Sequence, residues 1–283
     1  MLTLTALALA VTAVQGQDWS WSGPLAAGRT LTIRNIVGDV TVERASGGTV
    51  EIQARKRAGR RGDPADVTIH RIETSSGIEV CVIYPNMDQD DDDCDRRSSR
   101  RGRHDDRDQN DTRVYFTVRL PAGAHLDAGT VAGDVIARGL RGGEVELASV
   151  SGDIDASDVT APVLEVKTVS GDITLLGIAS GDVAGETVSG DVEYSGEVRS
   201  QGRYDFQSLS GDVILMVPEG LSARVNASTF SGDFFSDFAM SMSGSMSTSR
   251  KSRRRISGTI GEGSASLDLQ SFSGDVEIRR RGN

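Results

Sequence analysis

The dipeptide Gly-Asp recurs along this chain, and its aspartates are the residues whose spacing could support chemistry. From Gly133 onward the steps between copies are 19, 19, 10, 9, 21, 21 and 42 residues. One unit is therefore about 20 residues long, because 10 and 9 add up to 19 and 42 is twice 21. The glycines of the repeated turns are Gly38, Gly133, Gly152, Gly171, Gly190, Gly211, Gly232 and Gly274. The aspartates that follow them from the second copy onward are Asp134, Asp153, Asp172, Asp191, Asp212, Asp233 and Asp275.

Stacked units would place these carboxylates in a ladder that could bind cations. Carboxylates about 4.8 Å apart repel by roughly 1 kcal/mol per pair in water, and a bridging Ca²⁺ would reverse that cost. Alternatively, each aspartate accepts backbone N–H bonds in an Asx-type turn and needs no metal. Calcium-binding β-rolls use a nonapeptide with paired glycines, whereas here only Gly181 to Gly190 has that spacing, without the pair. The sequence favours the structural role and keeps calcium binding as an alternative.

Catalytic residues are not indicated by the sequence. His70, His104 and His125 are scattered, and neither a GxSxG elbow nor an HExxH metal motif occurs. A carbohydrate-active β-helix enzyme could use clustered Asp or Arg, but an aromatic content of 5% leaves little to stack on sugar rings. The net charge of -10 argues against a nucleic-acid partner. We predict a non-enzyme with no cofactor and no metal.

The residues around each Gly-Asp indicate the elements that position it. Leu164 and Val166 alternate before Gly171, and Ile173 and Leu175 alternate after it, with Val169 between. We interpret each half as a strand with one apolar face, and we place a corner where the phase shifts between Val166 and Val169. Glycine then lies on the inner side of a sharp bend, and the Ser and Asp beside it point outward. The same pattern occurs at Leu31, Ile33, Ile36, Val40 and Val42, and again at Leu267, Leu269, Phe272, Val276 and Ile278.

These strands predict an all-β fold, a single-stranded β-solenoid (β-helix) over residues 31–283. One coil cannot bury its own apolar stripe, but stacked coils share one core. Two polar loops interrupt the pattern, at about 86–112 and 236–257, and the second holds a basic cluster that ends at Arg255. Without them the chain provides roughly ten coils, in a rod on the order of 50 Å long. Residues 17–30 form an N-terminal segment before the first coil.

Residues 1–16 are uncharged and mostly apolar, which predicts a signal peptide, with a buried first strand as the alternative. No other run is long and apolar enough for a transmembrane segment, so the mature chain is expected to lack one. Cys81 and Cys94 flank a polar segment, which suits a disulfide in an oxidising compartment. We therefore expect export to the periplasm, the outer cell envelope or the extracellular space.

The repeated Val-Ser-Gly-Asp-Ile of residues 150–154 and 169–173 resembles the bacterial domain-of-unknown-function family labelled "putative adhesin". The C-terminal stretch from Gly261 to Val276 is similar to the closing coils of that family. The resemblance covers about residues 31–281 except the two loops, and it rests on repetition rather than on one motif. It implies a β-solenoid at or outside the cell envelope, with no catalytic residues to transfer.

The function that we expect is a non-enzymatic, exported, adhesin-like or scaffold β-solenoid that presents a flat, polar, repetitive face. Its partner would be an envelope polymer, a cell surface or another copy of itself. A calcium-binding module that uses the aspartate ladder and a carbohydrate-active β-helix enzyme are the two alternatives.

Overall fold

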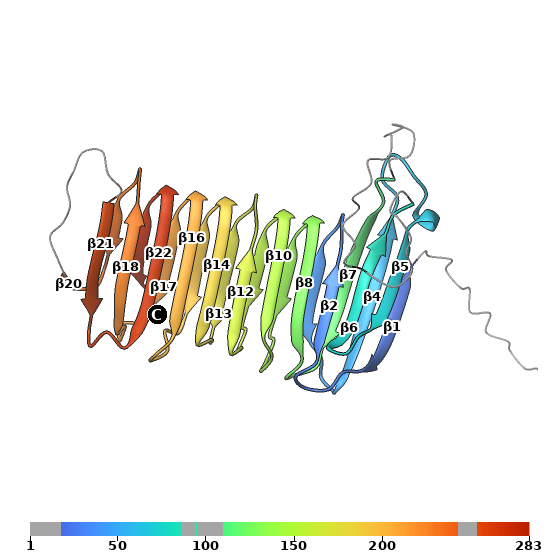
Figure 1. The fold of residues 1–283 in the computed structure, drawn as a ribbon, viewed down its shortest axis with the longest axis horizontal. Coiled ribbons are helices and arrows are strands. Elements are labelled where there is room, and N and C mark those ends of the chain that lie inside the picture. Colours follow the sequence, from blue (N-terminus) through green and yellow to red (C-terminus); the bar gives the residue numbers. More distant parts are fainter. Residues whose placement is uncertain (1–17, 86–93, 95–109, 243–253, 283) are drawn as a thin grey trace, which may run out of the picture.

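The fold is taken from a computed structural model of the chain, which describes residues 18–85, 94, 110–242 and 254–282. The predicted signal peptide and most of the first predicted loop lie outside these residues, as do residues 243–253 of the second. Apart from one short 3₁₀ turn at Pro64–Asp66, the regular elements of the described residues are all strands. They form a rod whose two sides are long sheets, here named sheet A and sheet B (Figure 1).

Each sheet has its own spatial order of strands. Sheet A contains, in order, β1 (Trp19–Pro24), β4 (Thr49–Arg57), β7 (Arg113–Leu120), β3 (Val40–Arg44), β9 (Val135–Arg138), β11 (Ile154–Ser157), β13 (Ile173–Ile178), β15 (Val192–Gly196), β17 (Val213–Val217), β23 (Val276–Arg280) and β19 (Phe234–Ser236). Sheet B contains, in order, β20 (Ser241–Met242), β21 (Arg254–Ile260), β18 (Ala223–Thr229), β22 (Ala265–Ser273), β16 (Arg203–Ser210), β14 (Asp182–Ser189), β12 (Val163–Lys167), β10 (Val145–Ser151), β8 (His125–Ala132), β2 (Thr30–Arg34), β6 (Gly77–Ile83) and β5 (Thr68–Glu73).

Each coil of the solenoid supplies one strand to sheet B, turns at Gly-Asp, and supplies the next strand to sheet A. Neighbouring coils pair in parallel, as β10 does with β12 and β11 does with β13. The predicted β-solenoid is therefore confirmed. The described residues contain eight such coils rather than the ten expected, because β1, β4, β5, β6 and β7 extend the sheets at one end as a cap with antiparallel pairs.

The coils are not stacked in chain order. The last coil, β22 and β23, lies between the coil of β16 and β17 and the coil of β18 and β19. The interval of 42 residues between Gly232 and Gly274 is therefore not two successive coils, and that interpretation was wrong. Instead the chain forms β21, which pairs antiparallel with β18 and begins within the segment expected to be a loop. It then crosses back over β18 and forms β22 between β18 and β16.

The predicted phase shift before the corner is also wrong. Inward and outward side chains continue to alternate through β12 and beyond its end. Val166 and Thr168 are both buried, and Val169, which follows them just before the corner, is 45% exposed. In seven of the eight described coils the inward position before the corner belongs to a Ser or Thr, and the apolar residue after it faces solvent. In the first coil the inward position belongs to Asn35. The corner itself comes at Ser170, Gly171 and Asp172, where the chain passes from sheet B to sheet A.

Glycine is required at the corner because successive coils touch there. A Cβ atom added at Gly190 would lie 2.0 Å from the carbonyl oxygen of Gly171 in the neighbouring coil, at a φ of 147° that L-residues rarely adopt. Gly181 was counted with the repeat, but it precedes β14 on the other side of the coil, and a Cβ there would meet nothing within 4 Å. The predicted need for glycine is correct, and its cause is contact between coils.

These two glycines flank the same strand and give a matched test. We predict that Gly190→Ala lowers the free energy of unfolding by about 2–3 kcal/mol, the cost of forcing atoms into a filled space. Gly181→Ala should change it by less than about 0.5 kcal/mol. Chemical denaturation of both variants measures the difference, and equal stabilities would contradict the contact between coils.

Candidate functional site

The aspartates of the corner form a hydrogen-bonded ladder along the rod. From Asp39 to Asp275 in spatial order, each accepts, through Oδ1, a hydrogen bond from the backbone N–H of the aspartate in the next coil, and Asp233 is the last donor. From donor to acceptor the bonds are Asp134 to Asp39 (3.1 Å), Asp153 to Asp134 (2.9 Å), Asp172 to Asp153 (2.8 Å), Asp191 to Asp172 (2.8 Å), Asp212 to Asp191 (2.7 Å), Asp275 to Asp212 (2.7 Å) and Asp233 to Asp275 (2.8 Å). The ladder thus extends by one member, Asp39, beyond the predicted set. The acceptor role is as predicted, but the bond joins two coils and is not made within an Asx turn.

A second ladder lies just inside the first and was missed from the sequence. The buried Ser or Thr three positions before each corner glycine donates its hydroxyl to the carbonyl oxygen of the glycine in the neighbouring coil. These donors are Thr130, Ser149, Thr168, Thr187, Ser208, Ser271 and Thr229, at 2.9–3.1 Å. In the first coil Asn35 takes this position, and its Nδ2 donates to the carbonyl oxygens of Gly38 and Val114. The signal was present, since every later copy has Ser or Thr at that position.

The two ladders engage the repeated carboxylate and hydroxyl groups of the corner in contacts between coils. One oxygen of each acceptor aspartate already holds a backbone N–H, and the hydroxyls bind carbonyl groups. Within the described ranges no group of three or more His, Cys, Asp or Glu side chains is placed to hold a metal ion. The carboxylates still influence one another, because partial burial and the charges of Asp153 and Asp134 raise the pKa of Asp155.

The outer face of sheet B carries polar side chains in rows that cross the strands. One row contains Asp127, Glu146 and Glu165 on neighbouring strands, in direct register. Partial burial, Asp127 and Glu165 raise the pKa of Glu146. Arg34 offsets part of this negative charge by binding both carboxylate oxygens of Asp127 at 2.5 Å. The face is therefore a flat array of charges of both signs.

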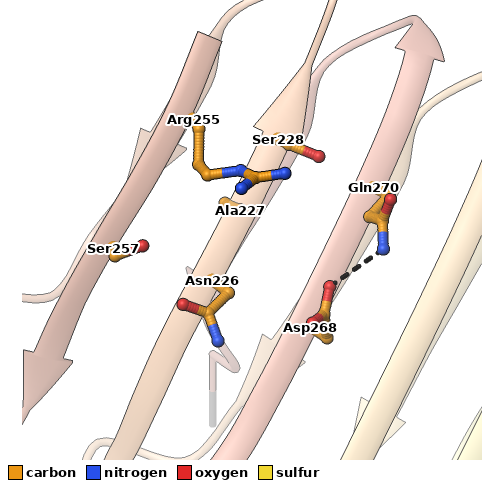
Figure 2. A pocket seen from close by; sticks show the side chains of 7 residues that line it. All are labelled: Asn226, Ala227, Ser228, Arg255, Ser257, Asp268 and Gln270. Carbon is orange, nitrogen blue, oxygen red and sulfur yellow. Dashed lines mark hydrogen bonds between the residues drawn. The ribbon is translucent and has the colours of Figure 1, made fainter. Parts of the chain in front are cut away.

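The same face is hollowed near the C-terminal end of the rod (Figure 2). The hollow has a volume of about 310 Å³ and lies over β18, β21 and β22. Arg255 extends from β21 across β18, and on β22 Gln270 donates to Asp268 at 3.1 Å. The lining residues are Asn226, Ala227, Ser228, Arg255, Ser257, Asp268 and Gln270. Guanidinium, amide, hydroxyl and carboxylate groups together offer donors and acceptors to a ligand rich in hydroxyl groups.

The predicted disulfide joins Cys81 on β6 to Cys94, with 5.9 Å between their Cα atoms. Of the three histidines, His70 lies on β5 and His125 on β8, with β6 and β2 between them, and His104 lies outside the described residues. His125 accepts the backbone N–H of Glu144 through Nδ1 at 3.2 Å. The structure does not bring the two described histidines together. No helix in the described residues is long and apolar enough to cross a membrane.

Two long sheets joined by glycine corners define the chain as a two-sided β-solenoid. Residues 124–279 match the family described as Toastrack DUF4097, and because this is more than half of the sequence, the chain belongs to that family. The match covers seven of the eight described coils, from β8 to β23, and leaves out only the coil of β2 and β3. A search of the curated proteins finds no match.

Three solved structures match most of the chain at low identity and low TM-score. A "putative cell adhesion protein" from Clostridium sporogenes is 12% identical, with 93% of this chain and 100% of that chain covered and a TM-score of 0.40. A "putative adhesin" from Bacteroides fragilis is 10% identical, with 92% and 96% covered and a TM-score of 0.41. A "putative adhesin" from Parabacteroides distasonis is 13% identical, with 93% and 98% covered and a TM-score of 0.32.

The aspartate ladder gives the second test. We predict that Asp172→Ala lowers the free energy of unfolding by about 1 kcal/mol, because the N–H of Asp191 loses its acceptor. Asp172→Asn, which keeps Oδ1, should stay closer to the parent. For the parent we expect millimolar Ca²⁺ to leave the melting temperature unchanged. A calcium-dependent rise that Asp172→Asn abolishes would instead assign the ladder to calcium binding.

Proposed function

We propose that this chain is a non-enzymatic, adhesin-like or scaffold β-solenoid that acts outside the cytoplasm and binds a polar polymer of the cell envelope. The observation that carries the proposal is the outer face of sheet B. There, parallel strands in register repeat polar side chains in straight rows along the rod. A regular flat face suits an extended partner that makes the same weak contact many times.

The corner chemistry supports a structural role over a catalytic one. The aspartates and the buried hydroxyls stabilise the contact between coils, and a substrate would have to displace those bonds to reach them. The carboxylates of sheet B lie on an open face, where water competes for every group. Binding of a polymer needs no such enclosure.

The hollow around Arg255 gives this face a point of stronger contact. Arg255 and Asn226 supply N–H donors, while Asp268 and Ser257 supply oxygen acceptors, so a sugar hydroxyl or an amide of the polymer finds partners of both kinds. The acidic row that leads away from it favours a neutral or zwitterionic polymer over a strongly anionic one. A peptidoglycan-like glycan with amide groups has this chemistry.

Two features support a location outside the cytoplasm. The Cys81–Cys94 disulfide persists best in an oxidising compartment. The uncharged apolar stretch of residues 1–16 has the character of an export signal. Mass spectrometry of the secreted or periplasmic chain would find its N-terminus near Gln17 if that stretch is removed.

Sedimentation with insoluble cell-wall glycan tests the proposal. We predict that the parent chain binds and that the double variant Arg255→Ala/Asp268→Ala binds about tenfold more weakly, because two polar contacts are lost. The control is Arg138→Ala/Asp155→Ala, which removes the same two residue types from the outer face of sheet A. Equal losses in both variants, or no binding by the parent, would contradict the proposal. Release of soluble sugar by the parent would assign an enzyme instead.

A further inference from the structure

An exposed row of large apolar side chains lies beside the glycine corners and extends along the length of the rod. The proposed polymer binding does not use it. The row supplies one residue from each of seven neighbouring coils, on the outer face of sheet B beside the aspartate ladder. In spatial order it contains Phe230, Phe272, Leu209, Val188, Val169, Val150 and Val131, which are 41–52% exposed. We name these seven residues the apolar row. Its members lie at, or directly after, the C-terminal ends of their sheet B strands, whose arrowheads point upward in Figure 1.

The apolar row is held straight by the pairing of the coils. The serines that follow Val150, Val169 and Val188 pair with one another across the coils, and the backbone of Ser170 donates to the carbonyl oxygen of Val150 at 3.0 Å. At one end the rings of Phe230 and Phe272 are stacked, with centroids 4.7 Å apart and planes 4° apart. The side chains therefore form one continuous ridge rather than scattered apolar residues, which would need no explanation.

Burial within the chain does not explain the apolar row. The inward position of each coil is already filled by the Ser or Thr that bonds to the glycine carbonyl. On β16, for example, the two outward residues before Leu209 are the polar Asp205 and Gln207. Other strands have an apolar residue at some of these positions, as β12 does with Val163, which is 36% exposed. Only the last outward position is apolar in every coil, so a contact outside the chain would account for it.

We propose that the apolar row packs against the same row of a second copy of this chain, with the two rods side by side and parallel. Two physical arguments favour a second copy. A partner must repeat at the spacing of about 4.8 Å to fit the ridge along its length, and a second copy necessarily does. Because about half of the surface of each of the seven side chains is exposed, the row offers roughly 500 Å² of surface per copy. A pair would therefore bury roughly 1,000 Å², which is the lower limit for a specific interface.

Charge decides the orientation of the two rods. The aspartate ladder lies on one side of the apolar row, and the outward row that includes Lys167, Glu186 and Gln207 lies on the other. A two-fold axis along the rods sets each aspartate ladder against this second row of the partner, which carries charges of both signs and not a line of carboxylates. An antiparallel pair would set the two aspartate ladders against each other, which repulsion disfavours.

Because the rods meet along one edge, the rest of sheet B stays open, and this inference does not depend on the proposed function.

Sedimentation velocity over a range of concentrations of the purified chain tests the pairing. The parent should form a dimer, and Leu209→Thr/Phe272→Thr should weaken it by about tenfold or more, because polar side chains replace two apolar members of the row. The matched control is Leu176→Thr/Phe235→Thr, since these side chains are 41% and 52% exposed and lie on sheet A. Melting temperatures show whether each variant is folded.

Cysteine cross-linking tests the orientation. In a parallel pair Ser231→Cys, beside Phe230 at one end of the row, should cross-link to itself. In an antiparallel pair it would cross-link only to Ala132→Cys, beside Val131 at the other end, and that result would overturn the parallel arrangement. A monomer at all concentrations, or a dimer that the row variants leave intact, would overturn the pairing. A monomer that floats with phosphatidylcholine vesicles would overturn it too and assign the apolar row to a lipid surface.

Discussion

The rest of this structure depends on the close approach of neighbouring coils at the glycine corner. At Gly152, Gly171, Gly190 and Gly211, a Cβ atom would lie 1.9–2.1 Å from the glycine carbonyl oxygen of the neighbouring coil. That approach places the carbonyl within reach of a buried hydroxyl and places each aspartate beside the next backbone N–H. Three interactions therefore repeat at the corner: the close contact of two glycines, the hydrogen bond from a hydroxyl to a glycine carbonyl, and the hydrogen bond from a backbone N–H to an aspartate. Together they set the spacing of the coils.

This constraint determines which surfaces remain for function. The groups with the most reactive character, the carboxylates and hydroxyls of the repeat, stabilise the stack and lie away from the open faces. The outer rows of sheet B carry charges of both signs, and the corner carries the apolar row. The two surfaces differ in chemistry and position, so the two proposed contacts, with a polar polymer and with a second copy, do not compete for the same side chains.

Much of the fold could be predicted from the sequence, because the repeat reports the strands and the corner glycine directly. The disulfide could be predicted as well, because Cys81 and Cys94 are the two cysteines of the chain and flank a polar segment. The stacking order could not, since every coil has the same local pattern and nothing in it says that β22 lies between β16 and β18. The exposure of Val169 could not be predicted, because apolar residues are usually buried. In the structure Thr168 takes the inward position and donates to the carbonyl oxygen of Gly152, and Val169 therefore faces solvent. The hollow around Arg255 joins residues from β18, β21 and β22, and antiparallel pairing across a predicted loop has no local signal.

The central claim is that the corners are contacts between coils and not free surface turns. Native-state hydrogen exchange of the backbone amides of Asp153, Asp172, Asp191 and Asp212 tests it most directly. Each amide lies at a partly or fully exposed residue, yet each donates to Oδ1 of the aspartate in the adjacent coil. The account predicts that they exchange as slowly as the amides of the central strands, through global unfolding. Exchange at the rate of an open turn would contradict it.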